Sequence, residues 1–142
     1  MAFVRDQLDD EEFRRWRDEA GQALDAARVQ AQADIHNWAC FSAEQAAQLA
    51  VKGALHGMSR GPWGHDLVRM AEMLVQAGID ISEEMMNRFR RLGRHYIAAR
   101  YPNAHASGAA AAHYGQGDAT EAIQDAEMIL AFVDVIWESL SA

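Results

Sequence analysis

Arginine and histidine are the residue types in this sequence that best suit chemistry on phosphate esters. Arginine can hold a phosphate group through two parallel hydrogen bonds, and histidine can take up or release a proton near neutral pH. Four pairs have four to six residues between an arginine and a following histidine: Arg60–His65, Arg88–His95, Arg90–His95 and Arg100–His105. With 12 arginines and 6 histidines in the chain, about one or two such pairs are expected by chance. The spacing alone therefore does not select a site.

Charge is placed unevenly along the chain. The stretch from Ser82 to His105 contains five arginines, whereas the stretch from Asp118 to the end contains six acidic residues and no lysine or arginine. The arginines are Arg88, Arg90, Arg91, Arg94 and Arg100. One interpretation is that the two helices expected here pair electrostatically or are simply solvated. The other is a basic strip that binds phosphate or an acidic partner.

Two further candidates involve a cation and a metal site. Lys52, the one lysine, could reach a phosphate or a carboxylate, or it could extend its charged end to solvent from a mostly apolar helix. His65 and Asp66 resemble the metal-binding His–Asp dyad of phosphohydrolases, but a metal site needs further His and Asp residues. The last expected helix offers Asp125 and Asp134 and no histidine. We therefore predict no metal site and no cofactor.

Aromatic and polar residues add weaker signals. Trp63, Tyr101 and Tyr114 could stack on nucleic-acid bases, or could cover the core beside turns. Glu44 and Gln45 lie on a largely apolar segment, where they could support a functional site, pack inside the protein or form a solvent edge.

The composition limits the classes of function. A formal net charge of -8 argues against general nucleic-acid binding and against DNA as a partner, while leaving room for a local basic site. The single cysteine, Cys40, predicts a buried and inert thiol. No apolar run of 18 residues is present, and the beginning of the chain is acidic. These features predict a cytoplasmic protein without a membrane span.

The elements that must position these residues are helices. Half of the residues are apolar and only two are proline, and the alanine-rich segment from Ile35 to His56 predicts a central helix packed on most sides. The other helices are expected from Asp9 or Asp10 to Gln32, from about His65 to Gly78, from Ser82 to Pro102 and from Asp118 onward. Asp34 is expected to cap the central helix, and residues 102–117 are expected to form a loop, or alternatively a short helix at Ala109–His113. We expect one all-α domain over residues 1–142.

Several stretches together resemble the HEPN domain family. They are NWACFSAEQAAQLAVKGAL in the central segment, HDL at His65–Leu67, HYIAARYPN at His95–Asn103, and DAEMIL near the end. Their order and spacing match from about Phe13 to Leu140. The resemblance implies an antiparallel bundle of about five helices that forms a homodimer.

The resemblance also implies a chemistry. Many members of the wider superfamily are metal-independent ribonucleases, often toxins paired with a small nucleotidyltransferase, with an Arg–(four to six residues)–His motif beside its copy in the dimer. Arg100 and His105 fit that motif at the RYP site, with Arg100 holding the phosphate and His105 transferring the proton. Lys52, Arg94 and Asn103 are the candidates for binding phosphate or nucleotide. The alternative is a non-catalytic dimeric module that binds a nucleotide or a partner.

Overall fold

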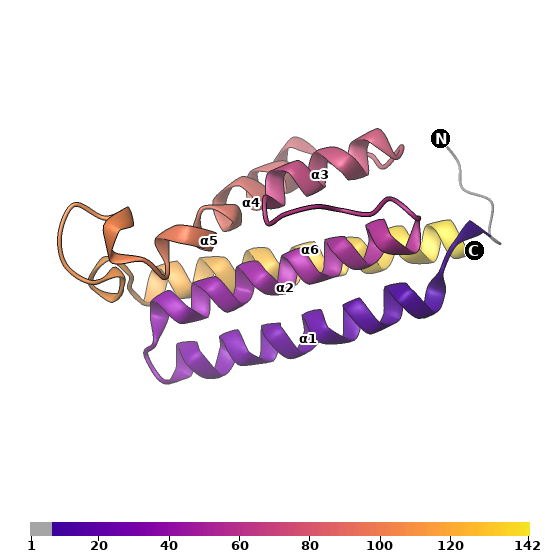
Figure 1. Ribbon diagram of the computed structural model, residues 1–142. Coiled ribbons are helices and arrows are strands. Elements are labelled where there is room, and N and C mark those ends of the chain that lie inside the picture. Colours follow the sequence, from indigo (N-terminus) through magenta and orange to yellow (C-terminus); the bar gives the residue numbers. More distant parts are fainter. Residues whose placement is uncertain (1–6) are drawn as a thin grey trace.

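The computed structural model describes residues 7–142, so the first six residues of the predicted domain lie outside the described part. This part is all-helical, as predicted, and contains no strand. Its helices are α1 (Asp10–Gln32), α2 (His36–Gly57), α3 (Leu67–Gln76), α4 (Glu83–Gly93), α5 (His95–Ala98) and α6 (Gln116–Ser141), with short 3₁₀ helices η2 (Pro102–Ala104) and η3 (Ala110–His113). In Figure 1, α2 lies between α1 and the layer of α3, α4 and α5, and α6 runs behind it. Within residues 7–142, no helix is both long and apolar enough to cross a membrane.

The central position of α2 follows from its composition, as the sequence predicted. Its alanines at positions 39, 43, 46, 47, 50 and 54 are fully buried. The beginning of this helix differs from the prediction, because the residue at the N-cap is Ile35 and not Asp34. Asp34 instead has a positive φ of 61°, in the tight turn between α1 and α2. Short polar side chains tolerate this left-handed conformation better than most others, so the residue forms the turn and does not cap the helix.

Two glycines on α2 allow neighbouring helices to approach closely. A Cβ atom at Gly53 would lie 2.7 Å from the Cβ of Trp16 on α1. A Cβ atom at Gly57 would collide with the ring of Trp137 on α6, which stacks on Phe13 at a centroid distance of 4.3 Å. The indole nitrogen of Trp137 also donates to Asp10 at 2.7 Å. This end of the bundle therefore fixes α1, α2 and α6 relative to one another.

Polar caps define α3 and α4. Asp66 is the N-cap of α3 and accepts a hydrogen bond from the backbone of Arg69, so α3 begins slightly later than predicted. Gly78 follows α3 with a φ of 96°, as predicted. Ser82, where this helix was predicted to begin, caps α4 by accepting a hydrogen bond from the backbone nitrogen of Met85.

The segment before Pro102 is not one continuous helix, contrary to the prediction. The α4 helix ends at Gly93, and α5 forms a separate single turn that begins at His95. Glycine has a low helix propensity, so an interruption at this position is reasonable. The alternative prediction of a short helix near Ala109–His113 is confirmed by η3, although its geometry is 3₁₀.

The start of α6 also differs from the prediction. The helix begins at Gln116, two residues before Asp118. The carboxylate of Asp118 accepts a hydrogen bond from the backbone nitrogen of Gly115 at 2.8 Å. Asp118 therefore stabilises the first turn from inside the helix instead of occupying the N-cap.

Ion pairs to α6 explain much of the uneven charge. The Asp125 side chain is almost completely buried and is held by Arg88 at 3.2 Å and Arg91 at 2.8 Å, both from α4. On the other side of α6, Asp134 pairs with Arg17 of α1 at 2.7 Å. The first interpretation of the charge pattern, pairing between these helices, is thus confirmed for Arg88 and Arg91.

Candidate functional site

Arg100 follows α5 and lies at the centre of an aromatic cluster. Its guanidinium carbon lies 4.3 Å from the ring centroid of Phe41, 4.5 Å from that of Tyr96 and 5.0 Å from that of Tyr101. Its Nε donates to the backbone oxygen of Tyr96 at 2.8 Å. No carboxylate among residues 7–142 forms an ion pair with Arg100. The aromatic rings therefore hold the positive charge in place without neutralising it.

His105 is positioned by a different group of residues. Its Nε2 lies 2.7 Å from the backbone oxygen of Ala98, and its ring stacks on that of His113 at a centroid distance of 4.2 Å. Because a backbone carbonyl can only accept, Nε2 must carry the hydrogen, which leaves the lone pair of the neutral ring on Nδ1. The structure thus holds Arg100 and His105 on separate partners, and within residues 7–142 no hydrogen bond or ring contact joins the two side chains.

The other predicted phosphate-binding residues are spread over the surface. Arg94 is exposed at the end of α4 and forms no ion pair within the described part of the chain. Lys52 is half-buried on α2, and burial lowers the pKa of its amine while the Glu44 charge opposes that change. Asn103 is exposed on η2. These three side chains do not form a single cluster with His105.

A polar network connects Arg100 to the interior of the bundle. Tyr96, beneath the Arg100 guanidinium, stacks on His65 at a centroid distance of 4.9 Å. The Gln48 amide nitrogen donates to the backbone oxygen of His65 at 3.0 Å and to Glu44 at 2.7 Å. Three segments of the chain therefore meet around Tyr96 and Gln48: α2, the segment before α3, and α5 with the residues that follow it.

Glu44 is the most unusual group in this network. Its residue has no exposed surface, although it is a carboxylic acid within an alanine-rich helix. Burial raises the pKa of Glu44 to about 7. Hydrogen bonds from Gln48 and Gln45, and the charges of Lys52 and Arg100, act in the opposite direction. Glu44 therefore changes its charge near neutral pH, beside the unneutralised Arg100.

Replacing Glu44 with glutamine is expected to remove a pH dependence of stability. The folded protein keeps the Glu44 proton up to about pH 7, whereas the unfolded chain releases it near 4.5, so unfolding releases a proton between these values. Stability therefore falls as pH rises through this window, by roughly 2 to 3 kcal/mol between pH 5 and pH 8. Urea unfolding at both pH values measures this change. An equal pH dependence in Glu44→Gln would contradict the assignment.

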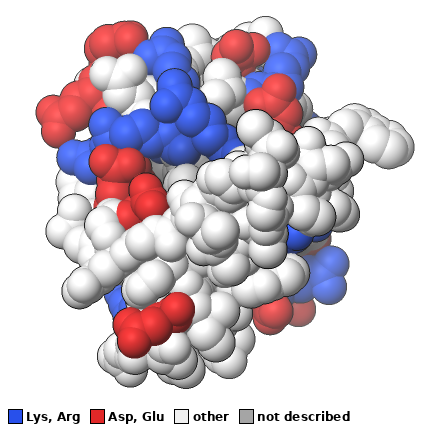
Figure 2. Space-filling view, turned by 90° about the vertical axis from the view of Figure 1, so that its left-hand side faces the viewer, with Lys and Arg blue, Asp and Glu red and all other residues white. Residues whose placement is uncertain are grey.

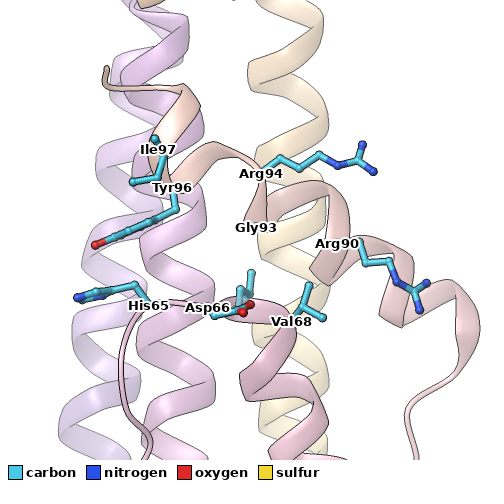
Figure 3. A pocket seen from close by; sticks show the side chains of 9 residues that line it. His65, Asp66, Val68, Arg90, Gly93, Arg94, Tyr96 and Ile97 are labelled. Atoms are coloured by element: carbon cyan, nitrogen blue, oxygen red, sulfur yellow. The ribbon is translucent and has the colours of Figure 1, made fainter. Parts of the chain in front are cut away.

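A cavity of about 550 Å³ opens beside this network, between the beginning of α3 and the junction of α4 and α5. Figure 3 shows His65 and Tyr96 together at one edge, while Arg90 and Arg94 extend from the opposite edge. Arg90 pairs with Glu83 at 2.7 Å, which leaves Arg94 as the cation at this rim without an ion pair among the described residues. On the end of the molecule that faces the viewer in Figure 2, basic and acidic side chains are interspersed over the upper part, next to a wide surface without Lys, Arg, Asp or Glu.

Trp63 does not cover the core, and this corrects one of the two alternatives considered for it. Its side chain is 91% exposed. Tyr114, by contrast, is half-buried, and its hydroxyl lies 2.9 Å from Nδ1 of His95. Burial raises the pKa of Tyr114 to about 12 and lowers that of His95. Cys40 is fully buried, and burial raises the pKa of its thiol to about 12, so it is unreactive as predicted.

The sequence did not identify Tyr96 as a residue of the site. The available signal was an aromatic residue four positions before Arg100, because residues at this spacing meet on one helix face. No comparable signal identified the stack of His105 on His113, which depends on the path of the segment after Pro102. Among residues 7–142, no group of three or more His, Cys, Asp or Glu side chains could hold a metal ion.

Comparison with known proteins places these features in a wider group. The HEPN domain family matches residues 13–136 of the chain. Three solved structures each align with 87% of this chain. The protein TT1696 from Thermus thermophilus has a TM-score of 0.83 and 36% identity, with 96% of its chain covered. The archaeal HEPN homologue ST0689 has a TM-score of 0.74 and 27% identity, with 95% covered. An HEPN domain protein from Thermotoga maritima, tm0613, has a TM-score of 0.71 and 25% identity, with 98% covered. No curated protein matches the chain.

Proposed function

Because the chain belongs to the HEPN domain family, we propose that it binds RNA or a nucleotide and that Arg100 contacts the phosphate. The observation that carries this proposal is the state of the Arg100 guanidinium. It rests on aromatic rings, uses its Nε for the backbone oxygen of Tyr96, and has no ion pair among the described residues. A planar cation fixed in this way is suited to bidentate hydrogen bonding with a phosphate.

Exposed aromatic rings beside Arg100 support a ligand that contains bases. Tyr101 is 46% exposed and lies under the guanidinium, and Trp38 is 43% exposed with its ring edge against Phe41. Single-stranded nucleic acids bind proteins through such rings together with basic side chains. The overall negative charge of the chain favours a contact confined to this site over a broad electrostatic one.

The second candidate function is a metal-independent endoribonuclease in which His105 transfers the proton. The observation that favours it is the hydrogen bond of Nε2 to Ala98, because it fixes the ring and leaves Nδ1 available as a base. Arg100 and His105 do not meet within one chain, so this mechanism requires a homodimer that brings one chain's Arg100 to the other's His105. We extend the proposal to a cytoplasmic homodimer with a small nucleotidyltransferase as partner.

Binding of a fluorescently labelled single-stranded RNA at several salt concentrations tests the leading proposal. We expect saturable binding. The logarithm of the association constant should decrease linearly with the logarithm of the salt concentration, with a shallow slope that corresponds to about one or two phosphate contacts. Inorganic polyphosphate serves as a competitor that lacks bases and should compete less well than unlabelled RNA. The absence of saturable binding at low salt would overturn the proposal.

His105→Ala separates the two candidates. In the presence of EDTA, a ribonuclease that uses His105 should lose cleavage by about a hundredfold or more, while binding of RNA is retained. Cleavage equal to that of the wild type would exclude His105 as the proton-transfer group. Binding without any cleavage by the wild-type protein would leave the non-catalytic module as the function.

A further inference from the structure

The opposite end of the bundle from Arg100 carries an apolar groove. It is formed by the C-terminal half of α6 and the turn between α3 and α4, with a volume of about 530 Å³. Its lining includes Ile79, Phe132, Val135, Ile136 and Leu140. In Figure 1, this half of α6 lies at the end of the molecule away from the segment of residues 99–115. The groove therefore has no residue in common with the site proposed for RNA.

The apolar surface continues along the outer face of α6. Met128 is 46% exposed and Val135 is 64% exposed. Met128, Phe132, Val135 and Ser139 recur at steps of three or four residues, so they form one stripe on the helix. Contiguous exposed apolar surface of this kind on a soluble domain is typical of an interaction site.

The charges around the groove all have the same sign. No lysine or arginine occurs in residues 77–87 or in α6, which form its two walls. Most acids on these walls already pair with arginines, for example Glu83 with Arg90 on the same helix and Asp134 with Arg17 on α1. Asp80, which lines the groove, is exposed and forms no ion pair within residues 7–142. A partner that covers the groove must therefore meet uncompensated negative charge.

We propose that this groove binds an amphipathic helix of a partner protein whose apolar face is flanked by lysine or arginine. The apolar side chains of that helix would fill the groove between α6 and Ile79, as amphipathic helices do in other helix-binding grooves. Its basic residues would lie opposite Asp80, which gives both affinity and selection against acidic helices. A second copy of this chain fits less well, because two acidic rims would face each other across the contact.

Two synthetic peptides test this proposal with the full-length protein. One is a helix with leucine at positions i, i+4, i+7 and i+11 and lysine on both flanks, and the other has glutamate in place of every lysine. Fluorescence anisotropy measures their affinities. We expect the lysine peptide to bind at least about tenfold more tightly than the glutamate peptide. Equal affinities would overturn the proposal.

Variants of the protein locate the binding surface. Val135→Ser should weaken the binding of the lysine peptide by about fivefold or more. Asp80→Asn should reduce the preference for the lysine peptide over the glutamate peptide. Val29→Ser is the matched control, because Val29 is an exposed valine on α1 with nearly the same exposure, 63%. Binding that Val135→Ser leaves unchanged would overturn the assignment. So would light scattering that shows a dimer for the wild type and a monomer for Val135→Ser, since a second copy would then occupy the groove.

Discussion

Arg100→Ala is expected to weaken the binding of labelled single-stranded RNA by roughly tenfold to a hundredfold, since a hydrogen bond to a charged group contributes about 1.5–3 kcal/mol. The guanidinium is the group that the Phe41 and Tyr96 rings hold in place without a carboxylate partner in the described chain. Alanine removes the contact to phosphate and leaves the aromatic rings. Anisotropy titrations at one low salt concentration measure the change.

Two further variants make this result specific. Arg14→Ala removes the same charge from an exposed position on α1, where Arg14 pairs with Asp10, and it should change RNA affinity by less than about twofold. Arg100→Lys keeps the charge and loses the planar geometry, so its affinity should fall between those of the wild type and Arg100→Ala. If Arg14→Ala and Arg100→Ala weaken binding equally, the interaction reflects total charge and no site at Arg100 exists.

Asp125→Ala is expected to destabilise the protein by about 3 kcal/mol, because breaking a buried ion pair leaves its partners uncompensated. The Asp125 side chain is 2% exposed and bridges Arg88 and Arg91, which attaches α4 to α6. The two arginine side chains retain partial contact with solvent, at 19% and 40% exposure, which places the expected cost at the lower end of the usual range. Urea denaturation measures the free energy of unfolding.

Asp134→Ala is the matched control for this prediction. Asp134 lies on the same helix and also accepts two hydrogen bonds from one arginine, Arg17, at 2.7 and 2.9 Å. Its side chain is 47% exposed, so water replaces the lost interaction and the expected cost is below about 1 kcal/mol. Equal losses of stability in the two variants would show that the burial of Asp125 does not determine its contribution.

The sequence predicted the helical elements well where local signals were strong. Asp9, Ser82 and Gly78 each occupy the terminal position that their residue type favours. The predicted helix ends were wrong where one residue type is compatible with two different local structures. Asp34 can cap a helix or form a left-handed turn, and the choice depends on how α1 and α2 pack, which is not a local property.

The candidate site could be predicted only in part for the same reason. The sequence showed the arginines but not their partners. Arg88 and Arg91 pair with Asp125, whereas Arg100 faces aromatic rings, and this difference arises only in the folded structure. The helical spacing of Tyr96 and Arg100 was available as a local signal. The burial of Glu44 against Gln48 and the backbone of His65 required the path of the segment between α2 and α3.

The fit of Trp137 against Gly57 has a consequence for the axial register of the bundle. A helix interface lined mainly by alanine is smooth, and by itself it would permit sliding by one turn, roughly 5.4 Å. The indole ring of Trp137 occupies the space over Gly57, and a slip of α6 by one turn would move the ring out of that space. Since Asp125 attaches α4 to α6, and α5 follows α4, a slip of α6 would move Arg100 away from Phe41 on α2. By fixing the position of Trp137, Gly57 sets the axial register of α6 and thereby the alignment of the aromatic cluster near the far end of α2.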